Sequence, residues 1–268
     1  MAQVSKRFLT RAKAKLRQFQ KLLESARARD VNESDTCVIV SDFLQDVLGY
    51  DKYAEVTTEF SIRSTFCDLA VRVDGHVQFL IEVKSVGTEL KAPHVRQAVD
   101  YAANGGIDWV LLTNGAQWHA YRLRFEKPIQ ADEIFMIDLL DPNVKTADLL
   151  DRLYLISREA GGDAALSQFL QLKEATSRYV LAQLLLSEDV IHLLRRDLRK
   201  LFPGLRVDDV RVRDVVRNEV IKRDCIEGDR VAAAEKIAKR AIRRRARANA
   251  ESEVSAPLPP SAGATPSA

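Results

Sequence analysis

The side chains best suited to chemistry lie in two alternating segments before the middle of the chain. Asp68 stands in the first segment, and Glu82 and Lys84 stand in the second. Two carboxylates and an ammonium group on neighbouring strands suit metal-dependent phosphodiester hydrolysis. Mg²⁺ and Mn²⁺ prefer oxygen ligands and lower the pKa of a bound water. The backbone carbonyl of Val83 could add a ligand, and the lysine would place the resulting hydroxide.

Whether these groups meet depends on how the two segments pair. Both alternate polar and apolar residues, which is typical of half-buried strands. A two-residue loop would mix the two faces of the hairpin. A three-residue loop over residues 74–76 instead pairs Val73 with Val77 and Asp68 with Glu82, so we predict that loop, with its glycine left-handed. The apolar side chains that would then share a face are Leu69, Val71, Phe79 and Ile81.

Two helices flank this hairpin in the sequence. Asn32 can cap the first helix, which places Glu33 in the first turn as a further candidate carboxylate. The alternative is that Glu33 only stabilises the positive end of that helix. Pro93 begins the second helix, on which Gln97 and Tyr101 share one face and can reach the same cleft.

The order of elements predicts the fold class. A helix and three strands are followed by a helix and two strands that join at a turn over Asn114-Gly115. We therefore predict an α/β (α+β) fold, a mixed β-sheet flanked by helices, followed by a helical C-terminal appendage. An isolated Glu-x-Lys is most often the solvent face of a hairpin. Strands covered on both sides should not carry such groups without a reason.

Composition excludes several classes of protein. The 268 residues are 46% hydrophobic and 29% charged, enough for a substantial core. No apolar run is long enough for a membrane span or a signal peptide, so we expect a soluble, cytoplasmic protein without membrane contact. The three cysteines form no Cys-x-x-Cys pair, and no phosphate-binding glycine loop occurs.

The net charge of +3 hides an uneven distribution. Both ends are basic and the middle is acidic. The C-terminal basic helix is a candidate for contact with nucleic-acid phosphates, although it could equally be a solvated terminal helix. The N-terminal basic helix has an apolar stripe suited to packing, so DNA contact there is the weaker reading. The candidate DNA-binding residues are Arg240, Arg243, Arg244, Arg245 and Arg247.

Together these motifs resemble the PD-(D/E)xK nuclease superfamily and, more narrowly, the N-terminal nuclease domain of type I restriction enzyme R subunits. The resemblance rests on an ordered set over residues 31–140: Asn32-Glu33, Leu48-Gly49-Tyr50-Asp51, Asp68, Glu82-Val83-Lys84, Gln97-x-x-x-Tyr101 and Leu112-Thr113-Asn114-Gly115-x-x-Trp118. The family's usual proline before the first aspartate is Cys67 here. Helicase domains that follow in full R subunits are absent, so the chain resembles the stand-alone form.

The resemblance implies a role for each matching residue. It makes Asp68 and Glu82 metal ligands and Lys84 the catalytic lysine. Glu33 becomes an auxiliary acid, and Gln97 with Tyr101 a pair that orients DNA or the site. The implied function is Mg²⁺-dependent or Mn²⁺-dependent DNA cleavage in restriction or defence.

The sequence also allows other functions and partners, and it predicts how the chain is divided into regions. The alternative function is a DNA-binding or assembly module with an unused site, and RNA is not excluded as substrate. A homo-oligomer or a protein partner is also possible. The expected organisation is a basic helix in 1–30, a nuclease-like domain in 31–143, a helical region in 144–228, a basic helix in 229–248 and a disordered tail in 249–268.

Overall fold

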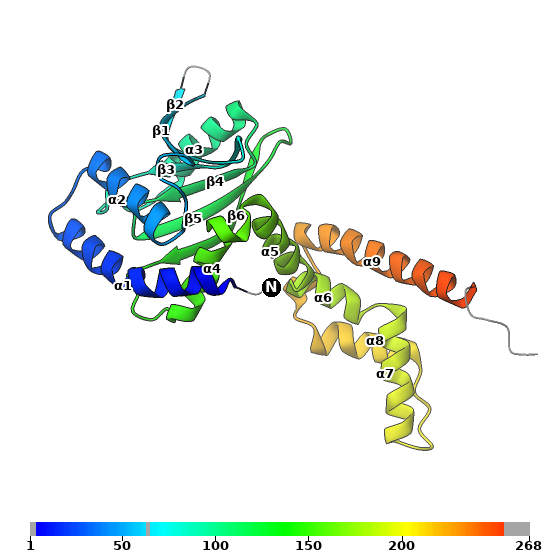
Figure 1. Ribbon diagram of the computed structural model, residues 1–268. Coiled ribbons are helices and arrows are strands. Elements are labelled where there is room, and N and C mark those ends of the chain that lie inside the picture. The colour runs from blue at the N-terminus through cyan, green and yellow to red at the C-terminus, as the bar shows by residue number, and fades with distance from the viewer. Residues whose placement is uncertain (1–3, 63–64, 255–268) are drawn as a thin grey trace, which may run out of the picture. The chain divides into compact units, whose positions relative to one another are not determined.

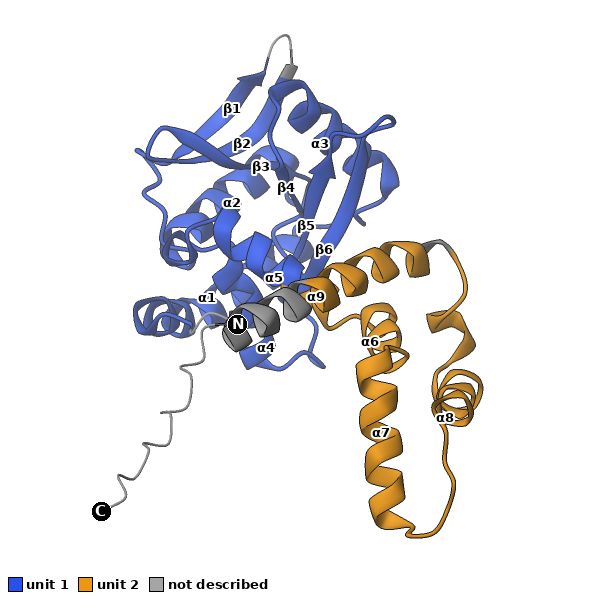
Figure 2. Ribbon diagram, turned by 90° about the vertical axis from the view of Figure 1, so that its right-hand side faces the viewer, with its two compact units in different colours: residues 1–171 blue, residues 172–268 orange. Residues whose placement is uncertain are grey.

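A computed structural model describes residues 4–62 and 65–254 of the chain. It divides into two compact units, residues 1–171 and residues 172–268 (Figures 1 and 2). The first unit holds a six-stranded sheet and the candidate site. The second unit is helical in its described part.

One sheet organises the first unit (Figure 1), and its strands lie side by side in sequence order. All neighbouring strands are antiparallel except the central pair β3 and β4, which are parallel and are connected through helix α3. The mixed sheet flanked by helices agrees with the predicted fold class. The strands are β1 (Val56–Ile62), β2 (Thr65–Val73), β3 (His76–Val83), β4 (Trp109–Thr113), β5 (Gln117–Arg124) and β6 (Gln130–Asp138).

Helices cover both faces of this sheet. Helices α1 (Lys6–Ala28), α2 (Glu33–Asp46) and α4 (Thr146–Leu155) pack on one face, and α3 (Ala92–Gly105) packs on the other. The larger core contains the four apolar residues predicted to share a face of the hairpin, Leu69, Val71, Phe79 and Ile81. Short helix η1 (Arg158–Ala160) and α5 (Asp163–Ala175) follow α4.

Helix α1 is an integral layer of the first unit. Its apolar side chains recur on one face, as predicted, and Phe8, Leu16 and Leu23 are almost fully buried. At its end Leu23 lies against Gly115, where a Cβ would come 2.8 Å from Leu23 Cδ2. The turn between β4 and β5 can therefore approach α1 closely only because Gly115 has no side chain.

The hairpin between β2 and β3 corrects the predicted loop. The turn is the two-residue Asp74-Gly75, with positive φ at both residues, and Val73 pairs with His76 instead of Val77. A bulge in β3 absorbs the offset, because the register shifts between the Val71 and Arg72 pairs. Leu69 still pairs with Ile81, so the predicted faces are preserved. Gly75 is left-handed, as predicted.

Strand β6 lies beyond the predicted strands, which end with the pair joined at Asn114-Gly115. It pairs along β5, and the register shifts where Ala120 faces Phe135 and Tyr121 faces Glu133. Ile134 is the extra residue, so the alternation of buried and exposed side chains breaks inside the strand. The missing alternation explains why the sequence pattern did not reveal it.

The second unit consists of helices around a small core. Ile191, Val212 and Val216 form its centre, and Ala234 and Ala238 are also buried. Helix α9 covers the predicted basic helix and continues to Val254, and residues 255–268 lie outside the described part. The elements are α6 (Arg178–Leu185), α7 (Glu188–Leu201), α8 (Asp209–Val215), η2 (Val216–Val220), η3 (Arg223–Cys225) and α9 (Asp229–Val254).

Candidate active site

The carboxylate of Asp68 is fixed at the point where β2 and β3 pair. Leu69 pairs with Ile81, so the same register carried one residue further sets Asp68 opposite Glu82, as predicted. The Asp68 Oδ2 atom accepts a hydrogen bond from the backbone N–H of Val83 at 2.7 Å. One carboxylate oxygen is therefore anchored to the neighbouring strand, and the other carries no protein hydrogen bond that we observe in the described residues.

Lys84 joins two carboxylates. Its Nζ atom donates to Glu82 Oε1 at 2.7 Å and lies 3.4 Å from Glu33 Oε1. The Glu82 side chain is only 2% exposed and that of Lys84 is 11% exposed, whereas that of Glu33 is 48% exposed. A buried carboxylate and a buried ammonium group thus meet near a more accessible acid on α2.

The surroundings keep these carboxyl groups easy to protonate. Burial raises the pKa of Glu82 to about 7, and the nearby charge of Asp68 adds to this effect while the bond from Lys84 opposes it. Burial also raises the pKa of Asp68, against the lowering effect of the Val83 N–H. For Lys84, burial lowers the pKa but the bond to Glu82 outweighs it, so the net change is upward. Burial is therefore the main cause of the raised carboxyl pKa values, and Lys84 offsets it only in part.

Helix α2 brings Glu33 to the sheet. The Asn32 side chain accepts a hydrogen bond from the backbone N–H of Asp35 at 2.8 Å, which confirms the predicted cap. Glu33 is the first helical residue, so the cap fixes the backbone from which its side chain reaches Lys84. Its first-turn position also suits the positive end of the helix dipole, and the two readings of Glu33 are compatible.

A cavity of about 360 Å³ adjoins the acids. Glu33, Asp68 and Cys37 line it, together with Lys52 and Glu59. No local pattern predicts that Cys37, Lys52 and Glu59 line this cavity, because they come from a helix face, a loop and a strand that only long-range packing brings together. Burial, together with the nearby charge of Asp68, raises the pKa of Cys37 to about 12, so the thiol stays protonated at neutral pH. Cys37 therefore lines the cavity as an uncharged thiol and lacks the thiolate that a nucleophilic cysteine needs.

Gln97 and Tyr101 lie on one face of α3, as predicted. The Gln97 Nε2 atom donates to the Tyr101 hydroxyl at 3.0 Å. Gln97 is exposed and Tyr101 is partly buried against the core on that side of the sheet. Within the described ranges we find no hydrogen bond from this pair to Asp68, Glu82 or Lys84. Gln97 and Tyr101 are therefore bonded to each other but not to the carboxylates of the site in the described residues.

The oxygen atoms predicted as ligands suit a cation such as Mg²⁺ that takes only part of its ligands from the protein. Among residues 4–62 and 65–254, no three His, Cys, Asp or Glu side chains gather closely enough to enclose a metal ion. The sequence predicts two carboxylates, those of Asp68 and Glu82, and the backbone carbonyl of Val83 as ligands. Mg²⁺ is commonly bound through one or two carboxylates and keeps several waters, so this small set is compatible with it.

The predicted DNA-binding arginines lie on α9, in the second unit. Ala234 and Ala238 of this helix are buried, while Arg240 and Arg243 are exposed. The side chains of Arg244, Arg245 and Arg247 lie outside what the structure describes, although their backbone is helical.

A search of the described helices finds none with the length and hydrophobicity of a membrane span.

Part of the chain is similar to known proteins. No curated protein matches the chain. A solved structure, that of the type IIG restriction endonuclease BpuSI, is 15% identical with a TM-score of 0.35, over 78% of this chain and 29% of that enzyme. The chain thus spans less than a third of that enzyme's length. The family model of the type I restriction enzyme R protein N terminus matches residues 38–137, a range that contains Asp68, Glu82 and Lys84. Residues 38–137 are therefore similar to the N terminus of type I restriction enzyme R proteins.

Proposed function

We propose that this protein hydrolyses phosphodiester bonds of DNA in a reaction that depends on Mg²⁺ or Mn²⁺. The observation that carries the proposal is the buried Glu82–Lys84 pair beside the anchored carboxylate of Asp68. An unused surface hairpin has no physical reason to bury an acid and a lysine together. The match to the R protein N terminus supports the same class of reaction.

Each residue of the site has a distinct part in this proposal. Asp68 and Glu82 would hold the cation, with the carbonyl of Val83 beside them. A cation bound there supplies Lewis-acid chemistry to the phosphodiester and makes a bound water more acidic. Lys84 places the attacking water and offsets charge on the phosphate. Glu33 holds the Lys84 ammonium group from the open side of the site, and Gln97 with Tyr101 orients the substrate strand.

The basic face of α9 is the proposed contact with the DNA backbone in the second unit. Arg240 and Arg243 are exposed, and Arg244, Arg245 and Arg247 continue the same basic run. Each phosphate that these arginines neutralise adds affinity that falls with salt and does not depend on base sequence. This assignment predicts uniform loss of affinity on substitution, without a change in sequence preference.

The decisive experiment compares cleavage by three site variants and by a matched surface pair. Asp68→Asn, Glu82→Gln and Lys84→Met should each lower DNA cleavage in Mg²⁺ or Mn²⁺ by about 100-fold or more, because each removes a ligand or the ammonium group. Glu89 and Lys91 form an exposed ion pair at 2.9 Å, so Glu89→Gln and Lys91→Met are the controls and should cleave normally. Thermal unfolding checks that all five variants fold.

Two other outcomes would overturn the proposal. Equal cleavage by wild type and all site variants would place the chemistry elsewhere. Salt-dependent DNA binding by the wild type without cleavage in either metal would instead identify a binding or assembly module. Parallel assays with single-stranded RNA decide the substrate class.

A further inference from the structure

The solvent face of α1 carries an unpaired line of cations. Lys6, Lys13, Arg17 and Lys21 are all exposed and recur at spacings of seven and four residues, so they lie along one side of the helix. Within the described residues none of the four forms an ion pair, whereas other basic residues of α1 do: Arg7 and Arg11 contact Glu159, and Lys15 contacts Asp46. We refer to the four as the α1 stripe.

The stripe is long enough to follow a polyanion. Lys6 and Lys21 are separated by about 22 Å along a helix that rises 1.5 Å per residue. Duplex DNA carries one phosphate per strand in each 3.4 Å or so, so the stripe spans roughly six base pairs. Helix α1 has eight basic residues and only one acidic residue, Glu24. Its charge is thus concentrated and mostly not offset.

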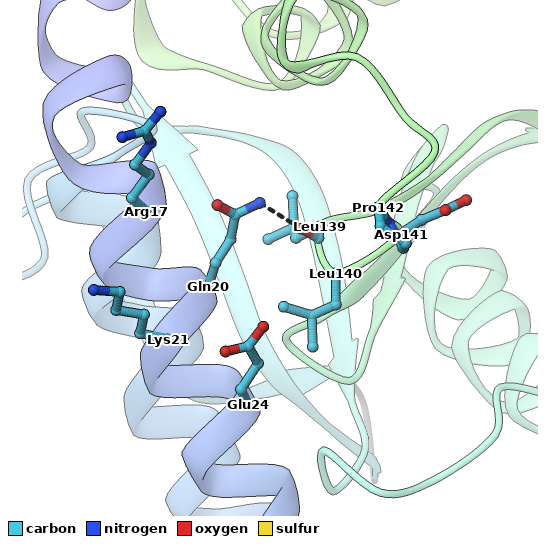
Figure 3. A pocket seen from close by; sticks show the side chains of 8 residues that line it. All are labelled: Arg17, Gln20, Lys21, Glu24, Leu139, Leu140, Asp141 and Pro142. Carbon is cyan, nitrogen blue, oxygen red and sulfur yellow. Dashed lines mark hydrogen bonds between the residues drawn. The ribbon is translucent and has the colours of Figure 1, made fainter.

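A pocket marks the C-terminal part of the stripe (Figure 3). Arg17 and Lys21 border a cavity of about 380 Å³ between α1 and the segment after β6. Gln20 spans that gap, donating to the backbone carbonyl of Leu139 at 2.6 Å, while Lys21 points away from the segment. Glu24 and Asp141 also line the cavity. The Gln20 bond fixes the helix beside the segment, so the two cations are held on a rigid element.

The C-terminal end of α1 lies near the loop that follows Lys84. Asp30, just after α1, lies beside Gly87, where a Cβ would come 3.2 Å from Asp30 Oδ1. Gly87 follows Lys84 by three residues, and Glu33 begins the next helix. The segment that leaves α1 therefore lies beside the loop that follows Lys84.

An anionic membrane is the less suitable occupant. A helix that binds lipid inserts its apolar face into the interface, but Phe8, Leu16 and Leu23 of α1 are buried in the core. The residues between the cations of the stripe include Thr10 and Gln18, which offer hydrogen bonds and no apolar anchor. Charge without an apolar anchor suits a phosphate backbone.

We propose that the α1 stripe is a nucleic-acid backbone contact of the nuclease-like unit, separate from α9. The proposal rests on the proposed function in one respect, that the substrate is a nucleic acid. The acids around Asp68 repel phosphates until a cation binds. In this proposal the cations of α1 attract the phosphates of the nucleic acid instead.

The test measures DNA affinity against salt for the full chain in EDTA, where cleavage does not occur. The stripe variant is Lys13→Gln with Arg17→Gln and Lys21→Gln. The control removes the same charge from the same unit at three other exposed positions, Arg72→Gln with Lys127→Gln and Lys145→Gln. The stripe variant should bind a short duplex on the order of tenfold more weakly. Its log–log salt slope should be lower by about 2 to 3, since each lost phosphate contact changes the slope by about 0.9.

The outcomes separate this proposal from the nuclease. The control should retain the wild-type salt slope, and an equal loss in control and stripe variants overturns the α1 assignment. A stripe variant that cleaves and binds as the wild type does also overturns it, while the nuclease proposal stands. Conversely, a wild type that binds through the stripe but never cleaves leaves the α1 contact standing and removes the nuclease. Loss of binding to vesicles of phosphatidylserine and phosphatidylcholine, with DNA binding unchanged, identifies a membrane contact and overturns the assignment.

Discussion

At the scale of single residues, Glu82 is a carboxyl group that the fold keeps partly protonated. Its side chain is almost fully buried, and its ionised form is opposed by burial and by the charge of Asp68. Lys84 offsets part of this cost through the 2.7 Å bond. The ionised form of Glu82 is therefore destabilised unless a cation lies beside it, which is the property that its proposed role as a metal ligand requires.

The raised pKa makes a pH-dependent prediction for the metal-free protein. The folded-state pKa of Glu82 is about 7, against an ordinary value of 4.5, so the folded chain binds a proton that the unfolded chain has already released in this range. Stability should therefore fall as the pH rises from about 4.5 to 7 and remain lower above it. Glu82→Gln removes the titrating group, so its loss of stability between pH 5 and pH 8 in EDTA should be smaller than that of the wild type, by about 2 kcal/mol or less.

Urea denaturation at pH 5 and pH 8 measures the effect. Glu89→Gln is the control, because Glu89 is 78% exposed at its side chain. It should keep the wild-type dependence on pH. A Glu82→Gln variant with the same loss of stability between pH 5 and pH 8 as the wild type would contradict the assignment.

At the scale of elements, the N-cap of α2 positions an acid as well as a helix. Asn32→Ala removes the hydrogen bond to the Asp35 N–H and should lower the free energy of unfolding by about 1 kcal/mol. It should also lower cleavage, because the backbone at Glu33 is then less well fixed and its side chain is held less firmly beside Lys84. Ser5→Ala is the matched control, since Ser5 precedes α1 without a side-chain cap bond and its loss should change neither quantity. Chemical denaturation and a cleavage assay report both effects, and equal stability of the two variants would contradict the prediction.

Two turn glycines separate backbone strain from crowding. Gly75 and Gly115 both have φ of +81°, so alanine is strained at either position. Nothing lies within 4 Å of a Cβ at Gly75, whereas a Cβ at Gly115 would meet Leu23 Cδ2 at 2.8 Å. Gly75→Ala should cost about 1 kcal/mol and Gly115→Ala clearly more, because α1 must move as well. Urea midpoints measure both, and a smaller loss at Gly115 would refute the close approach.

Local patterns predicted most of the elements around the site but not the irregular ones. Alternation revealed the strands that carry Asp68 and Glu82, and turn and capping residues marked both flanking helices. The two failures have one physical cause: bulges change the register between paired strands. The bulge in β3 restores the register that a two-residue turn would otherwise spoil, and the bulge at Ile134 hides β6.

The sequence predicts only those parts of the site that depend on the pairing of β2 with β3. The meeting of Asp68, Glu82 and Lys84 follows from the register of one hairpin. The contact between Lys84 and Glu33 depends on how α2 packs on the sheet, and the placement of Cys37 and Lys52 around the cavity depends on the same packing. Such long-range packing leaves no signal in a short window of sequence.

At the scale of the whole molecule, a cation bound at the proposed site should raise the stability of the protein. Mg²⁺ or Mn²⁺ that binds only the folded chain raises its stability by mass action. The melting temperature of the wild type should rise by a few degrees at millimolar metal, and Asp68→Asn should abolish the rise. Glu89→Gln should keep it. Differential scanning fluorimetry measures the shift, and an equal rise for Asp68→Asn would place the metal elsewhere.

The burial of α1 has a consequence for where the folding unit ends. The family model begins at residue 38, yet Phe8, Leu16 and Leu23 from the preceding helix complete the core beneath the sheet. A fragment trimmed to the matched boundaries would leave Phe43, which contacts both Phe19 and Trp118, open to water on one side. The smallest autonomous version of this domain must therefore begin before α1, at a point that homology boundaries alone do not mark.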